Sequence, residues 1–187
     1  MTPVPVLFAP PKPWEPDDWF KPGPPVALFN RNEPAVRQTA SWTCAAASMA
    51  WVMNALQIEA PGGGKWTEWT SVAALREVGG PAAITPEYGL AYASGVDLEK
   101  VYVGYGLSVE RIVPATWSEV ALASERTIGQ LGGARWYHWT GLRGYDGQTF
   151  SLANPAPNWK GVGDDLDDSE WDRWGAWNAV MITGEHY

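Results

Sequence analysis

The first long apolar stretch of the chain predicts a helix that is buried on every side. Residues 42–57 are rich in alanine, which has the highest helix propensity, and apolar residues fall on nearly all faces of the predicted helix. Ser41 or Thr43 is available as the N-cap, and the glycines after Pro61 end the segment. This pattern is typical of a helix in the middle of a domain, and it places Cys44 at or near the first turn.

Three more helical segments are predicted before the pattern changes. One helix is predicted over residues 67–78, which two glycines close, and another over residues 97–105, which stops at Gly106. Between them, Thr85 followed by Pro86 has the cap and first-turn proline of a short helix.

The second part of the chain has mainly the pattern of strands. Residues 107–113, 127–131 and 176–183 read as short strands, and a helix is predicted over residues 117–123. Helices therefore come first and a sheet second, which predicts the α+β class.

The clearest hairpin joins residues 136–144 to residues 148–154. The three residues between them end in glycine, which fits a type I turn followed by a left-handed bulge residue. In this register His138 lies directly opposite Asn154, whereas a slip of one residue would move Asn154 to the other face of the sheet.

Ten of the sixteen prolines lie in the first 34 residues, which excludes a regular helix or a central strand there. We therefore predict an extended arm over residues 1–34 and one domain over residues 35–187. Two interpretations of the arm stay open: a disordered tail, or a docking arm whose Trp14, Trp19 and Phe20 contact the domain or a protein partner.

The composition is that of a globular domain and excludes several functions. Of the 187 residues 45% are hydrophobic and 18% are charged, and the net charge is -8. Such a chain lacks the clustered cations that nucleic acids require, so no nucleic-acid partner is expected. There is no apolar run of about 18 residues and no signal-peptide pattern, which predicts a soluble chain without membrane insertion.

Candidate chemistry centres on Cys44, the only thiol, which excludes an intrachain disulfide. A helix N-terminus and a neighbouring imidazolium both lower the pKa of a thiol and make it a nucleophile. The alternative is a buried cysteine that acts as a small apolar residue. Of the two histidines, His186 is the penultimate residue, so His138 is the candidate base, although it could equally be an ordinary strand residue.

Two further residues complete a candidate site. The Asn154 side chain can accept the proton of one imidazole nitrogen and leave the other to face the thiol, although Asn-Pro is also a common turn. Asp146 is a weaker alternative because it lies at the hairpin tip. Gln38 lies six residues before Cys44, where its amide and the cysteine N–H could hold an oxyanion, although a loop glutamine is usually only solvated.

Taken together, these residues resemble the C39-like branch of the papain-like cysteine peptidases. The likeness rests on Gln38 and Cys44 with five residues between them, and on His138 and Asn154 sixteen residues apart on a hairpin that ends in Asn-Pro. It spans about residues 35–183.

The resemblance implies a papain-like fold, in which a helical half carries the cysteine and an antiparallel sheet carries the histidine and the asparagine. It implies hydrolysis of peptide bonds through a thioester, with Cys44 as nucleophile, His138 as base, Asn154 as orienting residue and Gln38 in the oxyanion hole. It implies no metal and no cofactor. The residues around the cysteine lack the glycine-bearing signature of papain, which affects the expected substrate rather than the chemistry.

Within this family two substrates are open: double-glycine peptides, and the stem peptides of peptidoglycan that phage lytic enzymes cleave at the bacterial cell wall. Trp42 and Trp139, close in sequence to the cysteine and the histidine, are the predicted substrate contacts. Two other functions use the same fold: a catalytically silent binding or structural module, as in virion assembly, and acyl transfer.

Two other groups of residues are assigned to the fold. The six acidic residues within 164–172 lack the alternating spacing of a calcium loop and are predicted to lie at a helix N-terminus. Trp171, Trp174 and Trp177 recur at every third position and are predicted packing contacts.

Overall fold

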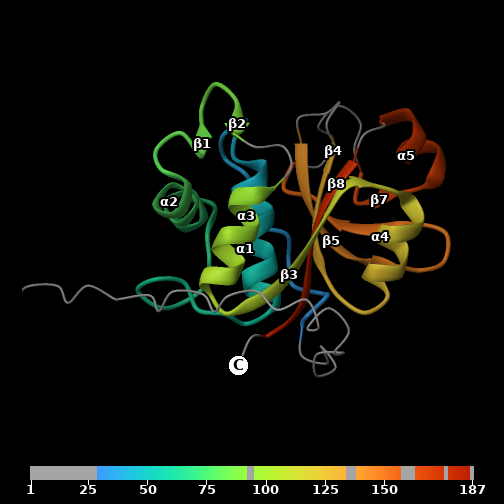
Figure 1. The fold of residues 1–187 in the computed structure, drawn as a ribbon, viewed down its shortest axis with the longest axis horizontal. Helices are drawn as coiled ribbons and strands as arrows, with labels where there is room; N and C mark the ends of the chain where they lie inside the picture. Colours follow the sequence, from blue (N-terminus) through green and yellow to red (C-terminus); the bar gives the residue numbers. More distant parts are fainter. Residues whose placement is uncertain (1–28, 92–94, 134–137, 157–162, 175–176, 186–187) are drawn as a thin grey trace, which may run out of the picture.

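The computed structural model describes residues 29–91, 95–133, 138–156, 163–174 and 177–185. Figure 1 shows helices packed on both sides of a twisted sheet. None of the helices in these ranges is both long and apolar enough to cross a membrane.

The helical half is built around α1 (Cys44–Ala55), and all of its residues are buried, as predicted. α2 (Glu68–Gly79) and α3 (Val96–Gly104) pack beside it (Figure 1). Between α2 and α3 lies a small sheet of β1 (Ile84–Thr85) and β2 (Gly89–Leu90).

The prediction of a short helix at Thr85 and Pro86 is wrong. Thr85 ends β1 and pairs with Gly89, and Pro86 begins the turn of the β1–β2 hairpin. The Thr85 hydroxyl accepts the backbone N–H of Tyr88 (3.3 Å), so it closes a turn instead of capping a helix. Gly89 has a φ of 65°, a left-handed conformation that returns the chain to the second strand.

The rest of the chain forms a six-stranded antiparallel sheet in the order β3-β8-β4-β5-β6-β7. The strands are β3 (Leu107–Ala115), β4 (Gly129–Gly133), β5 (His138–Tyr145), β6 (Phe150–Ala153), β7 (Asp165–Leu166) and β8 (Trp177–Glu185). α4 (Trp117–Ser124) and α5 (Asp168–Trp174) lie on the face away from α1 (Figure 1). The predicted α+β class is therefore confirmed.

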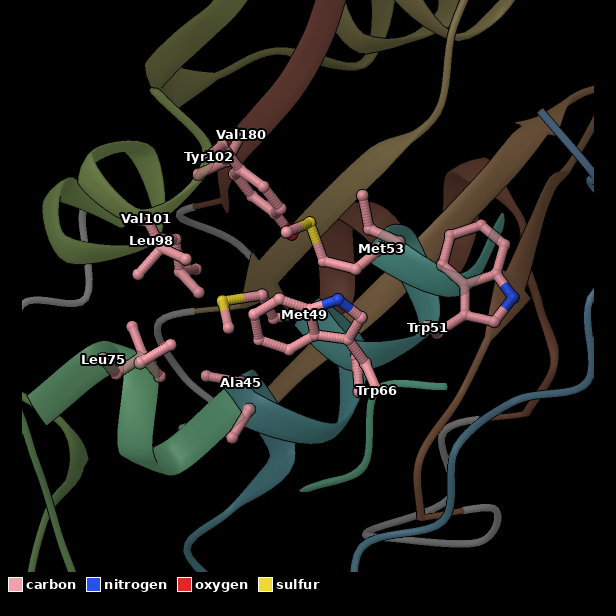
Figure 2. Packing of buried hydrophobic residues seen from close by; sticks show 14 of the residues in the cluster. Ala45, Met49, Trp51, Met53, Trp66, Leu75, Leu98, Val101, Tyr102 and Val180 are labelled. Atoms are coloured by element: carbon pink, nitrogen blue, oxygen red, sulfur yellow. The ribbon is translucent and has the colours of Figure 1, made fainter. Parts of the chain in front are cut away.

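Each face of the sheet has its own apolar core, and the strands alternate between them. On β8, Val180 and Ile182 belong to the core shared with α1, α2 and α3, whereas Ala179 and Met181 belong to the core under α4 and α5. Figure 2 shows the first core, where methionines of α1 meet residues of α2, α3 and β8: Met49, Met53, Leu75, Leu98, Val101, Tyr102 and Val180.

The acidic segment lies at the start of α5, as predicted. The Asp167 carboxylate accepts the backbone N–H of Glu170 (2.9 Å) in the first turn. Trp171 stacks on Trp177 with ring centroids 4.7 Å apart, which agrees with the predicted packing role. Among the residues that the structure describes, no three His, Cys, Asp or Glu side chains are grouped to hold a metal ion.

Residues 29–33, which the sequence assigns to the arm, are hydrogen bonded to the domain. The N–H of Asn30 donates to the carbonyl of Ala55 at the end of α1 (2.8 Å), and the carbonyl of Glu33 accepts the indole N–H of Trp51 (2.9 Å). The boundary between arm and domain stays a prediction, because the rest of the arm lies outside the described residues.

The close approach of α1 to β5 depends on a glycine. Trp51 is fully buried, and a Cβ placed on Gly141 would lie only 2.3 Å from its ring. In Figure 2 the Trp51 ring lies on the side of α1 away from Tyr102. One turn toward the start of α1, the Ser48 hydroxyl donates to the carbonyl of Trp139 on β5 (3.1 Å). The start of α1 is thereby fixed against β5.

Replacing Gly141 by alanine should destabilise the fold, because the new methyl group meets a ring that has no room to move. We expect a loss of about 1–3 kcal/mol, or a melting temperature lower by about 2–10 °C. Gly104→Ala is the control, since nothing lies within 4 Å of its Cβ position. Thermal unfolding followed by circular dichroism measures both, and equal melting temperatures for the two variants would contradict the close contact.

Candidate active site

Cys44 is the first residue of α1, and its sulfur lies beside β5. The backbone N–H of Trp139 donates to Sγ (3.4 Å), and the cysteine is 6% exposed. β6 ends at Ala153, opposite Gly141, so the first residues of β5 extend past their neighbour. The thiol therefore occupies the edge of β5 where a neighbouring strand would otherwise continue.

Burial raises the pKa of the Cys44 thiol, because the thiolate loses its hydration. Hydrogen bonds from the backbone N–H groups of Trp139 and Ala45 act in the opposite direction but do not outweigh burial. A thiol in these surroundings needs a positive neighbour to ionise near neutral pH.

His138 and Asn154 are brought together as the sequence predicts. Nε2 of His138 lies 3.0 Å from Oδ1 of Asn154, and the two residues are 2% and 0% exposed. The orientation of the asparagine amide is fixed, since Nδ2 donates to the carbonyl of Gly163 (2.9 Å) and Oδ1 accepts the N–H of Ala156 (3.0 Å). An oxygen facing Nε2 requires a proton on Nε2, so Nδ1 is the nitrogen that can take up a proton.

The predicted register of the hairpin is wrong by two residues. Gly141 pairs with Ala153, so Asn154 lies beside Thr140 and diagonal to His138 instead of directly opposite it. A shift of two residues keeps both side chains on the same face. Diagonal neighbours are about 7–8 Å apart, a distance that a histidine and an asparagine side chain can bridge.

A bulge at Arg143 decides on which face Asn154 lies. The strands pair as Tyr145↔Phe150 and Gly144↔Ser151 near the loop, and as Leu142↔Leu152 and Gly141↔Ala153 beyond it. Arg143 is therefore the extra residue. If Arg143 paired with Leu152 in a regular ladder instead, Asn154 would lie opposite Gly141, on the face that packs against α1 and away from the His138 side chain.

The loop of the hairpin is longer than predicted because Asp146 closes it. Its carboxylate accepts the backbone N–H groups of Gln148 (2.8 Å) and Thr149 (2.7 Å), and its own N–H donates to the carbonyl of Thr149 (3.2 Å). Asp146 is therefore a turn residue at the hairpin tip, and the residue that contacts the imidazole is Asn154.

Gln38 lies at the entrance to α1, as predicted. Its side-chain Nε2 donates to the carbonyl of Ala40 (3.0 Å), which also accepts the N–H and the hydroxyl of Thr43. Its backbone N–H donates to the carbonyl of Pro155 (3.1 Å), directly after Asn154. The Gln38 amide is thus held beside the residue that precedes the cysteine.

The two predicted substrate contacts lie in different surroundings. Trp42 is half-buried and packs edge-to-face on Trp69 (5.9 Å between centroids), which is 52% exposed, so the pair offers an aromatic surface close to the cysteine. Trp139 is 5% exposed, and its ring packs in the core against Gly132. Its backbone nitrogen, and not its ring, faces the thiol, so a substrate contact by the ring stays a prediction.

One residue of the site was not anticipated from the sequence. Glu68, the first residue of α2, is 3% exposed, and its carboxylate accepts hydrogen bonds from the loop that precedes α1. Burial by itself would raise the pKa of Glu68, but hydrogen bonds from Thr43, Thr39 and Ala40 outweigh it and lower the pKa. In the sequence Glu68 looks like an ordinary first-turn acid after the N-cap Thr67, and nothing there signals its burial.

No protein-family model matches the sequence, and no curated protein matches it significantly. Solved structures do share the fold. The peptidase domain of Streptococcus ComA, a bifunctional ABC transporter involved in quorum sensing, matches with a TM-score of 0.55 and 15% identity, covering 82% of this chain and 99% of that one. A double-glycine-motif protease from an AMS/PCAT transporter, solved with its leader peptide, gives 0.54 and 17%, covering 80% and 91%.

A C39-like peptidase structure from Bacillus anthracis also matches, with a TM-score of 0.51 and 10% identity, covering 84% of this chain and 98% of that one. Identities this low establish the fold and not the activity. The chain thus has the papain-like fold of the C39 peptidase domains. The fold that the sequence resemblance implied is confirmed.

In its neutral form, the His138 imidazole should carry its proton on Nε2. The reason is that Oδ1 of Asn154 faces Nε2 and can only accept a hydrogen bond. Nitrogen-15 NMR of the histidine side chains measures this, and His138→Ala identifies the signals. In Asn154→Ala the preference for this tautomer should weaken. A parent protein with the proton on Nδ1 above the imidazole pKa would contradict the assigned geometry.

Proposed function

We propose that the protein is a cysteine peptidase that hydrolyses peptide bonds through a thioester intermediate. One observation carries the proposal. The Cys44 sulfur at the start of α1 lies 3.4 Å from the backbone nitrogen of the residue after His138, and the imidazole of His138 is held by Asn154. These positions support Cys44 as nucleophile, His138 as base and Asn154 as orienting group at the edge of one strand.

In the proposed reaction the Cys44 thiolate attacks the carbonyl carbon of the scissile peptide bond. His138 gives a proton to the leaving amine, the C–N bond breaks, and a thioester to Sγ remains. Water then attacks the thioester with His138 as base, which releases the acid and restores the thiol. Asn154 keeps Nε2 protonated throughout, so that Nδ1 carries the proton that is exchanged.

The oxyanion formed in each attack needs donors. We assign this role to the N–H of Cys44 and to Nε2 of Gln38, which is held at the carbonyl of Ala40. The N-terminus of α1 adds its positive end at the same place. Donors of this kind contribute roughly 3 kcal/mol each to stabilisation of the transition state.

The raised pKa of the buried thiol makes His138 necessary for ionisation. With the imidazolium nearby, the thiolate should form below the usual thiol pKa of about 8.5. Without it, burial outweighs the hydrogen bonds from backbone N–H groups to Sγ, and the thiol should ionise above that value. The pH dependence of alkylation separates the two cases.

Alkylation of Cys44 by iodoacetamide, followed by intact mass, should proceed near pH 7 in the parent protein. In His138→Ala the rate should rise only above about pH 8.5, because burial then outweighs the backbone hydrogen bonds to Sγ. The single cysteine makes the signal unambiguous. The same measurement in urea, where the thiol is exposed, gives the reference rate for each pH.

Two outcomes of this measurement are decisive. A profile that shifts to higher pH in His138→Ala supports a thiolate–imidazolium pair. Identical profiles in the parent and the variant would contradict the proposal of a cysteine peptidase. The remaining hypothesis would then be a peptidase-like scaffold that acts by binding.

For the substrate we propose a peptide whose chain beside the scissile bond lies on the aromatic surface of Trp42 and Trp69. Two classes are candidates: stem peptides of peptidoglycan, which would place the protein at the bacterial cell wall, and double-glycine leader peptides. The second class is suggested by the double-glycine-motif protease of similar fold, which was solved with a leader peptide.

Purified peptidoglycan and a double-glycine peptide should be incubated in parallel with the parent and with Cys44→Ala, and the products identified by mass spectrometry. We expect cleavage of one class, abolished in Cys44→Ala. Trp42→Ala should raise KM several-fold with a smaller effect on kcat, since it removes binding surface and no reacting group. Leu122→Ala, an exposed site on α4, is the control and should change neither constant. Cleavage that persists in Cys44→Ala would contradict the proposal.

A further inference from the structure

We propose that Glu68 is a positioning residue that assembles the oxyanion site from a different helix. This inference rests on the proposed function, because it concerns the donors that would hold the oxyanion. The carboxylate lies at the start of α2, whereas the nucleophile lies at the start of α1. The two are joined by hydrogen bonds through the loop over residues 38–43.

The carboxylate holds this loop from the inside. The backbone N–H of Thr39 lies 2.9 Å from both carboxylate oxygens, and the N–H of Ala40 lies 3.2 Å from one of them. The hydroxyls of Thr39 (2.7 Å) and Thr43 also donate to Glu68. Two backbone and two side-chain donors thus converge on one buried carboxylate.

The same carboxylate engages the N-cap residue of α1. A threonine at this position usually accepts a backbone N–H of the first turn with its side chain. Thr43 makes no such bond, because its hydroxyl is turned toward Glu68 and the carbonyl of Ala40, two acceptors that share its single proton. The N-cap side chain therefore does not cover the first-turn N–H groups of α1, including that of Cys44. Glu68 keeps this end of the helix open to an incoming anion.

The second proposed oxyanion donor, Nε2 of Gln38, is fixed through the backbone of Ala40. Glu68 binds the N–H of Ala40, and the carbonyl of Ala40 accepts Nε2 of Gln38 (3.0 Å). Among the described residues, Oε1 of Gln38 is buried and has no hydrogen-bond partner, so the Ala40 carbonyl alone sets the orientation of this amide. Both proposed oxyanion donors thus depend on one carboxylate.

The negative charge is needed for this arrangement. A glutamine at position 68 would have the same size but would turn an NH2 group toward donors, and donors cannot bond to one another. At 3% exposure water has little access to replace the lost bonds. Glu68→Gln should therefore loosen residues 38–43 without creating a cavity.

The test compares two reactions of the same thiol. Iodoacetamide is attacked at a saturated carbon and forms no oxyanion, so its rate reports the thiolate alone. 4-Nitrophenyl acetate is attacked at a carbonyl, its C–O bond breaks, nitrophenolate leaves and an acetyl thioester forms on Cys44. Its rate therefore also reports the oxyanion donors. The ratio of the two rates measures the oxyanion site by itself.

In Glu68→Gln we expect acylation to fall at least tenfold, while alkylation changes less than about twofold. Thr67→Ala is the matched control. It removes the N-cap of the same helix and lowers the melting temperature, but it touches none of the loop donors, so the ratio should stay at the parent value. Thr43→Val removes one donor to Glu68 and should also lower the ratio of acylation to alkylation. This variant replaces Glu68→Gln in the test if Glu68→Gln does not fold.

The inference would be overturned if Glu68→Gln and Thr43→Val both gave the same ratio of acylation rate to alkylation rate as Thr67→Ala. Glu68 would then be a purely structural residue. Failure of the proposed function looks different. In that case the parent protein itself reacts slowly with both reagents near pH 7, and His138→Ala changes neither rate.

Discussion

The contact between α1 and β5 is the constraint on which the candidate site depends. Gly141 lets the Trp51 ring reach the backbone of the strand, and Ser48 is bonded to the same strand nearer the cysteine. These contacts place the sulfur of Cys44 at the strand edge, beside the backbone of Trp139. A side chain at position 141 would move the helix outward and separate the Cys44 sulfur from the strand that carries His138.

Much of the fold could be predicted from the sequence, because it depends on local patterns. The buried character of α1 follows from apolar residues on all its faces, and the meeting of His138 with Asn154 follows from their places on one hairpin. The prediction of a short helix at Thr85 was wrong because a threonine before proline suits a turn as well as a helix cap. Local signals of this kind identify an element but do not choose between two uses of the same residues.

The parts that could not be predicted depend on contacts between distant residues. The register of the hairpin is set by the hydrogen bonds of Asp146 at its tip and by the bulge at Arg143, and a count of residues reveals neither. The Arg143 side chain donates to the carbonyls of Leu152 and Glu33, so the bulge is fixed from outside the hairpin. The burial of Glu68 likewise arises only when the loop before α1 folds over α2.

The bulge at Arg143 has a consequence for how such a hairpin can vary. Side chains alternate between two faces, so the asparagine stays on the face of the histidine only while the pairing beyond the bulge is kept. Deleting Arg143 would remove the extra residue and leave a regular ladder in which Asn154 still lies beside Thr140. Deleting one residue of β5 between the bulge and His138 would instead turn the two side chains to opposite faces. Insertions in the exposed loop, before the pairing begins, leave the pairing untouched. Single-residue changes are therefore tolerated at the tip of the hairpin and at the bulge, and excluded along the part of the strands that carries the site.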